Sequence, residues 1–76
     1  MRETLDAVRK RLSRDYLGKV NIHGIGMSRL ENCIRIYVQI DGSEVQQEVL
    51  AEIVQAAIPF LVQIIDEQPP QLAQSA

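Results

Sequence analysis

The sequence predicts an α+β fold, a two-layer sandwich in which a three-stranded mixed sheet carries two helices on one face. Two segments have apolar residues at spacings of three and four, which is typical of helices. A segment between them alternates apolar and other residues, which is typical of a strand. With an apolar run near the end, the expected order is helix, strand, strand, helix, strand. We expect one domain over residues 1–66 and a flexible tail over 67–76.

The first helix is expected over residues 3–16. Its apolar stripe consists of Leu5, Val8, Leu12 and Tyr16. Gly18 follows at the position where glycine commonly ends a helix.

Two strands are expected next, over residues 19–27 and 33–40, joined by a hairpin loop from Ser28 to Asn32. If Met27 pairs with Cys33, two pairs of apolar residues come together on the core side of the sheet. These pairs are Val20 with Ile40 and Ile22 with Val38. Gly24 and Gly26 then also lie on the core side, where they give a helix room to approach closely. A bulge at the glycines would reverse this assignment of faces.

The second helix is expected to begin after Asp41-Gly42 and to run to about Ala57. Ser43 and Gln46 have the spacing of a capping box. The broad apolar stripe of this helix consists of Val45, Val49, Leu50, Ile53, Val54 and Ala57. Pro59 disfavours helical geometry at Ile58, and residues 60–65 then form the third strand.

Composition restricts the classes of function. The chain has 76 residues, 46% of them hydrophobic, and a net charge of −2. The longest unbroken apolar run is far shorter than the roughly 20 residues of a membrane span, and the first residues are charged where a secretory signal would be apolar. Cys33 is the only cysteine, so no intrachain disulfide is available. We therefore expect a cytoplasmic protein.

An open sheet face is the first candidate for a functional surface. In the two-layer arrangement no element covers the second face of the sheet, and large apolar patches usually mark interfaces. We expect self-association or binding of a protein partner through this face or through a strand edge. The candidate interface residues are Ile25, Tyr37, Leu61 and Ile65. The alternative is that these apolar residues are exposed singly, as is common on small sheets.

A basic helix face is the second candidate. Residues 1–20 have a net charge of +3 and residues 21–76 a net charge of −5. Four cations of the first helix form a candidate anion-binding face for nucleic acid or an acidic protein partner: Arg9, Lys10, Arg11 and Arg14. Nucleic acid is not the expected ligand because the pI is about 5.2, whereas nucleic-acid modules are usually strongly basic. A solvated helix face is the simpler interpretation.

Candidates for catalysis or metal binding are few. His23, Met27 and Cys33 are candidates for a metal or redox site on one face of the predicted hairpin, without the spacing typical of a metal site. Gly24-Ile25-Gly26 lies inside a strand and lacks the context of a phosphate-binding loop. We therefore expect no enzyme activity, no metal, no cofactor and no small-molecule substrate.

The order of elements is similar to that of the C-terminal domain of iron–sulfur scaffold proteins. That family has a CxxC motif at the start of the second helix, where this chain has Asp41-Gly42-Ser43-Glu44, so cluster binding is not implied. The chain also resembles short uncharacterised bacterial modules with a Gly-x-Gly strand. The matching pieces are His23-Gly24-Ile25-Gly26, Ile34 to Val38, and Ile58-Pro59. This second resemblance implies no particular activity.

Overall fold

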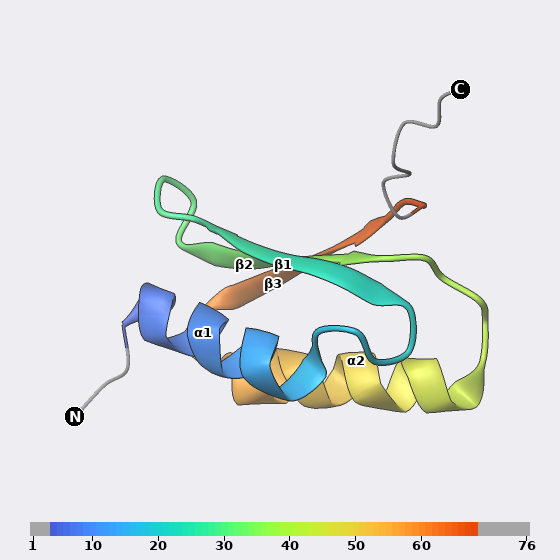
Figure 1. Cartoon of the computed structure of the whole chain (residues 1–76). Helices are drawn as coiled ribbons and strands as arrows, with labels where there is room; N and C mark the ends of the chain where they lie inside the picture. Colours follow the sequence, from blue (N-terminus) through green and yellow to red (C-terminus); the bar gives the residue numbers. More distant parts are fainter. Residues whose placement is uncertain (1–3, 69–76) are drawn as a thin grey trace, which may run out of the picture.

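The computed structural model describes residues 4–68 and confirms the α+β fold. Its elements are α1 (Leu5–Tyr16), β1 (Ile22–Ser28), β2 (Cys33–Val38), α2 (Glu44–Ala56) and β3 (Leu61–Asp66). The three strands form one layer and both helices lie beneath the same face of it (Figure 1). Of the tail predicted for 67–76, only Glu67 and Gln68 fall within the described residues.

Each helix begins at a residue whose side chain caps it. The hydroxyl of Thr4 accepts a hydrogen bond from the backbone N–H of Ala7, and that of Ser43 accepts one from the N–H of Gln46, both at 3.1 Å. Such caps satisfy N–H groups that have no partner inside the helix. The capping box is only half formed, because the N–H of Ser43 bonds to Asp41 and not to the side chain of Gln46.

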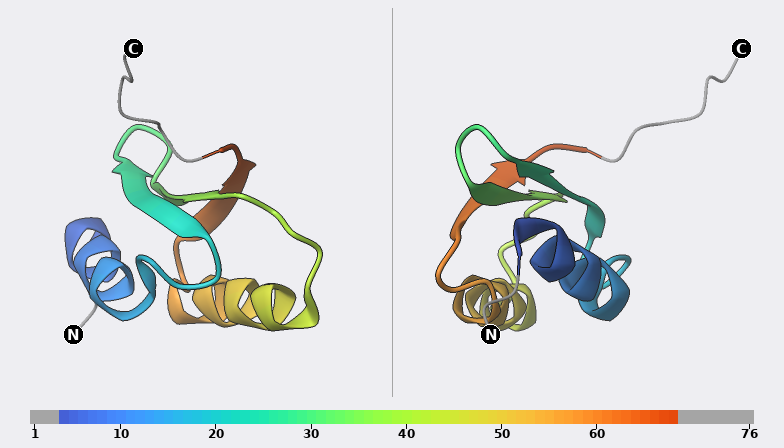
Figure 2. Two further views of the ribbon diagram at one scale, coloured as in Figure 1. Left: turned by 45° about the vertical axis from the view of Figure 1, so that its right-hand side comes forward. Right: turned by 90° about the vertical axis from the view of Figure 1, so that its left-hand side faces the viewer.

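The strand order is β1-β2-β3, with β2 in the centre. β1 pairs with β2 antiparallel and β3 pairs with β2 parallel, so the sheet is mixed. α1 packs against β1, and α2 lies on the side of β3, as the two views of Figure 2 show. β1 and β3 are therefore the two edges of the sheet.

A bulge in β1 changes the expected register. Ile22 pairs with Val38 as predicted, but Gly24 then pairs with Tyr37 and Ile25 with Ile36, so His23 is the extra residue. A one-residue shift turns every later side chain to the other face. The placement of Ile25 and Met27 on the open face was therefore wrong, because both pack against the core on the helix side.

The glycines of β1 are also on the face opposite to the predicted one. A Cβ atom built at Gly24 would lie 3.2 Å from Cδ2 of Tyr37, and one at Gly26 would lie 3.7 Å from Cε2 of the same ring. The glycines thus make room for the Tyr37 ring on the open face and not for a helix on the other. A large aromatic ring covering strand glycines is a known means of stabilising a sheet.

The hydrophobic core lies between the sheet and the two helices. Its buried members are Val8, Leu12, Ile22, Ile34, Ile36, Val38, Leu50, Ile53 and Ala57. The predicted pair of Val20 and Ile40 was wrong. Val20 belongs to the turn before β1, where its φ is 44°, and Ile40 lies beyond β2 and is partly exposed. Val45, expected on the buried stripe of α2, is also exposed.

One buried polar side chain connects α2 to two chain segments. Gln46 is 1% exposed. Its Nε2 donates to the carbonyl oxygens of Val20 at 2.8 Å and of Gln39 at 3.0 Å, and its Oε1 accepts from the N–H of Asp41 at 3.0 Å. These bonds hold the turn before β1 and the segment after β2 against the start of α2.

Acid is expected to weaken the connection between β2 and α2. Hydrogen bonds from Ser43 lower the pKa of Asp41 below its ordinary value of 3.8. A carboxylate with a lowered pKa in the folded state stabilises the fold above its unfolded pKa, and that contribution is lost as pH falls through the folded pKa. Urea unfolding should therefore show a loss of stability below about pH 4. Asp41→Asn should lose less stability over this range than the wild-type chain, and an equal loss in both would contradict the assignment.

Candidate functional site

The open sheet face carries a smaller apolar surface than the sequence predicted. Ile25 and Met27 point to the other side, the ring of Tyr37 packs over the glycines of β1, and Cys33 is 1% exposed. Of the four predicted interface residues, the register therefore leaves Tyr37, Leu61 and Ile65 on this face.

A polar cluster crosses the open face. Arg35 in β2 donates to Glu31 at 3.1 Å and to the side-chain oxygen of Gln63 in β3 at 3.3 Å. The hydrogen bond to Glu31 raises the pKa of Arg35, so this guanidinium keeps its charge. The apolar residues of the open face are thus interrupted by a charged group, which does not suit burial of the whole face against another flat surface.

Exposed apolar side chains gather instead around β3. Leu61 is 70% exposed, Ile64 is 41% exposed, and Ile58 precedes the strand with 62% of its surface exposed. Leu61 lies on the open face, whereas Ile64 pairs with Ile36 and lies on the helix side. The apolar surface therefore extends around the outer edge of β3 from one face of the sheet to the other.

The backbone of β3 presents unpaired groups at this edge. The N–H of Glu67 donates to the carbonyl of Val38 at 3.0 Å, so this group points toward β2. Backbone groups alternate in direction along a strand, so the N–H and C=O of Val62 and Ile64 point away from β2. Within residues 4–68 these outward groups make no backbone hydrogen bond to another segment. The edge is therefore open to another strand.

The two edges of the sheet differ in how well they are protected. Proteins usually protect exposed edges with bulges, charges or proline. β1 has a bulge at His23 and two glycines. Residues 61–65 of β3 form a run, Leu-Val-Gln-Ile-Ile, without charge, proline or bulge. Asp66 ends the strand, and its carboxylate accepts a hydrogen bond from the N–H of Ile40 in the same chain at 3.1 Å.

The flank of α2 nearest to this edge includes Val54. Glu52 bonds to Tyr16 of α1 at 3.2 Å, so the side of α2 that carries Glu52 faces α1. At about 100° per residue, Val54 and Gln47 lie on the opposite side of the helix, toward β3. Val54 is 39% exposed. The flank of α2 around Val54 thus lies away from Glu52, whereas Glu44 and Glu48 line a hollow with Gln47 nearer the start of the helix.

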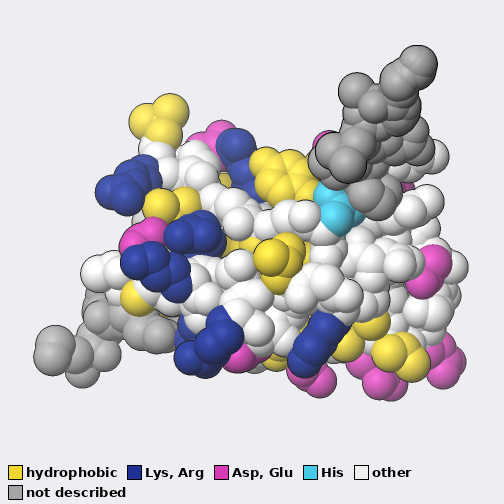
Figure 3. Space-filling view, viewed as in Figure 1, with side chains coloured by type: hydrophobic (Ala, Val, Ile, Leu, Met, Phe, Trp, Pro, Cys, Tyr) yellow, Lys and Arg dark blue, Asp and Glu magenta, His cyan; other side chains and the backbone are white. Residues whose placement is uncertain are grey.

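The predicted anion-binding face consists of cations that already have partners. Arg9 and Lys10 each lie 3.4 Å from the carboxylate of Asp6, and Arg14 lies 3.0 Å from that of Asp15. Arg11 donates to the carbonyl of Ala56 at 2.9 Å and so joins the two helices. Lys and Arg side chains do gather on the face shown in Figure 3, over α1 and toward the hairpin loop. The pairing of Arg9, Lys10 and Arg14 with carboxylates reduces the charge offered to an anion.

The three potential metal ligands do not come together. Met27 points to the helix side, Cys33 lies on the open side, and Nε2 of His23 lies 3.0 Å from the carbonyl oxygen of Glu67. The expectation that these three residues share a face was wrong. Among residues 4–68 no group of three or more His, Cys, Asp or Glu side chains is arranged to hold a metal ion.

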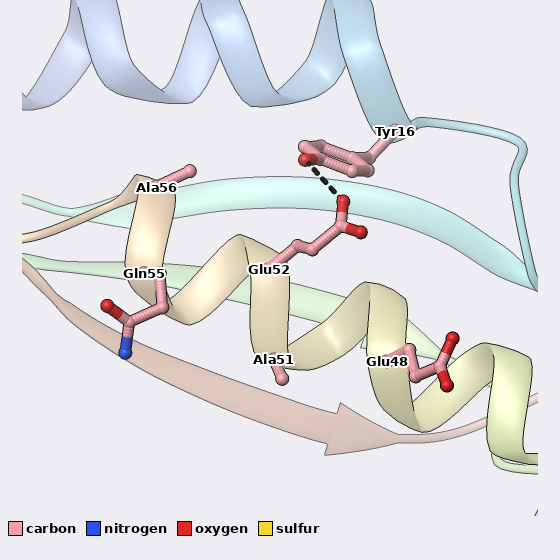
Figure 4. A pocket seen from close by; sticks show the side chains of 6 residues that line it. All are labelled: Tyr16, Glu48, Ala51, Glu52, Gln55 and Ala56. Atoms are coloured by element: carbon pink, nitrogen blue, oxygen red, sulfur yellow. Dashed lines mark hydrogen bonds between the residues drawn. The ribbon is translucent and has the colours of Figure 1, made fainter.

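A shallow pocket lies between the end of α1 and the outer side of α2 (Figure 4). Its lining consists of Tyr16, Glu48, Ala51, Glu52, Gln55 and Ala56. Burial, together with the neighbouring Glu52, raises the pKa of Tyr16, so the phenol stays protonated and donates to the carboxylate. No nucleophile paired with a base is among these residues.

Comparison of the chain with protein-family models, curated proteins and solved structures gave no match. The resemblance in element order to the C-terminal domain of iron–sulfur scaffold proteins therefore stays a prediction. None of the helices within residues 4–68 has the length and apolar character needed to cross a membrane. The geometry of the β3 edge is thus the strongest indication of function.

Proposed function

We propose that this chain is a small, non-catalytic association module whose binding element is the free edge of β3. A partner strand would extend the sheet by bonding to the outward backbone groups of Val62 and Ile64. The observation that carries the proposal is an unprotected apolar edge strand whose exposed side chains lie on both faces of the sheet. The compartment proposed is the cytoplasm, where a lone thiol such as Cys33 stays reduced.

Sheet extension accounts for the exposed apolar residues better than burial of the open face does. An added strand places its side chains beside Leu61 on the open face and beside Ile64 on the helix side at once. Covering the open face alone would leave Ile64 in water and would bury the charge of Arg35. Removing apolar surface from water contributes about 25 cal/mol per Å², so a partner that reaches both faces is favoured.

The mass in solution tests whether the chain associates at all. Light scattering across a range of protein concentrations is expected to give a mass that rises above the 8.6 kDa of one chain. Leu61→Asp or Ile65→Asp should lower this mass while leaving the helix content unchanged, because a charge beside the edge opposes a second strand. A mass of one chain at every concentration would contradict self-association.

A further inference from the structure

We infer that the occupant of the β3 edge is the β3 strand of a second copy, paired antiparallel about a two-fold axis that passes midway between the two Gln63 residues. This inference rests on the proposed function and goes further, because it names the partner and the register. The two sheets would join into one continuous six-stranded sheet with all four helices on one side. Closed two-fold dimers of this kind are the commonest arrangement of soluble oligomers.

The sequence of β3 is self-complementary about Gln63. In an antiparallel pair centred there, Leu61 lies opposite Ile65 of the second copy, and Val62 lies opposite Ile64 of the second copy. Each apolar residue thus lies opposite an apolar residue, and the side-chain amide of Gln63 lies opposite the side-chain amide of Gln63 in the second copy. The side-chain oxygen of Gln63 is already bonded to Arg35, so its NH₂ group is left to donate across the axis.

Neighbouring registers are less favourable. Opposite residues must lie on the same face of the sheet, so the axis must lie between two copies of the same residue. The nearest alternative registers are therefore centred on the neighbouring residues, Ile64 and Val62. Centring the axis on Ile64 would place Val62 opposite the carboxylate of Asp66. Centring it on Val62 would place Ile64 opposite Phe60 and Ile65 opposite Pro59, two residues that precede the strand, which begins at Leu61. Only the register about Gln63 pairs the whole uncharged run of β3 with itself.

The backbone directions agree with this register. Val62 and Ile64 have outward N–H and C=O groups, so each can exchange two hydrogen bonds with its opposite residue in the second copy. Gln63 points its backbone groups toward β2, so the two Gln63 residues form the non-hydrogen-bonded pair at the centre. In such a pair the Cα atoms lie about 4.5 Å apart, within the range of about 4.4–6.8 Å that a disulfide needs.

Single cysteines placed in β3 test the register. In a Cys33→Ala background, which leaves no other thiol, Gln63→Cys is expected to form a disulfide-linked dimer with oxidised glutathione and to revert on reduction. Leu61→Cys is the matched control, because two copies of residue 61 would lie about 14 Å apart along the strands and should not cross-link. An equimolar mixture of Leu61→Cys and Ile65→Cys chains should yield the mixed dimer.

Each other outcome overturns a definite part of the proposal. Cross-linking of Leu61→Cys alone, or no cross-link in Gln63→Cys while the Cys33→Ala parent is dimeric by light scattering, would overturn the register but leave the association module standing. A parent that has the mass of one chain at all concentrations, with an unchanged circular dichroism spectrum, would overturn the inference that a second copy occupies the edge. That last result would assign the edge to a different protein.

Discussion

Replacing Ile64 by proline is expected to break the association while leaving the domain folded. The N–H of Ile64 points away from β2, so proline removes an intermolecular donor and no bond within the sheet. The preceding Gln63 is extended, which is the conformation that a following proline favours. Two such donors are lost per dimer, at about 0.5–1.5 kcal/mol each, so the dissociation constant should rise by about 10- to 100-fold.

Two control variants separate the backbone contribution from other effects. Ile64→Ala keeps the N–H and removes most of the exposed side chain, so it should weaken the dimer less than proline does. Gln63→Pro removes an N–H that points toward β2, so it should lower the free energy of unfolding of the monomer itself. If Ile64→Pro associated as tightly as the wild-type chain, the β3 edge would not be the interface.

Replacing Gln46 by methionine is expected to cause a large loss of stability in the monomer. Methionine is similar in size, but it leaves the carbonyl of Val20 and the N–H of Asp41 without their partner. The carbonyl of Gln39 keeps only the 3.4 Å hydrogen bond from Nδ2 of Asn21. A buried unsatisfied polar group costs about 1–3 kcal/mol. Some of these backbone groups can reach water after the change, so we expect a total loss of about 2–4 kcal/mol in the free energy of unfolding.

Gln55→Met is the matched control for this substitution. Gln55 is an exposed residue of α2 that lies beside the hollow lined by Tyr16, so the same chemical change should alter the free energy of unfolding by less than about 0.5 kcal/mol. Urea unfolding of both variants measures the difference. Equal effects at the two positions would show that the buried hydrogen bonds of Gln46 do not stabilise the turn before β1.

The helices and the central strand could be predicted from the sequence because their periodicity is strong. Leu5, Val8 and Leu12 follow the helical spacing, and Ile34 and Ile36 alternate with polar residues. The bounds differ from the structure by only a few residues. An element that buries one side has apolar residues at the period of that element, and this period can be read from the sequence.

The register of the hairpin could not be predicted in the same way. The bulge at His23 adds one residue to β1, and a single residue decides which face Ile25 and Gly24 occupy. The glycines are a local sign of a bulge, but they do not determine its position. Packing determines the register of the hairpin, since Ile25 is partly buried against the core and Tyr37 covers the glycines.

The candidate site was only partly predictable. A strand edge could be expected as one way to associate, but Val62 and Ile64 were missed because their role depends on the strand order. Once β3 is known to be an edge, the uncharged run from Leu61 to Ile65 is a clear signal. The buried hydrogen bonds of Gln46 were also not predicted. A polar residue at helical spacing from Leu50 and Ile53 is nevertheless a sign of a buried hydrogen-bonding group.

Amide hydrogen exchange along β3, followed by NMR at several protein concentrations, tests pairing at the β3 edge most directly. The N–H groups of Gln63 and Ile65 point toward β2 and should be protected at every concentration, which makes them an internal control. Those of Val62 and Ile64 should exchange rapidly in dilute protein and become protected as the concentration rises. If Val62 and Ile64 exchange rapidly at concentrations where the mass shows a dimer, the chains associate through another surface and pairing at the β3 edge is contradicted.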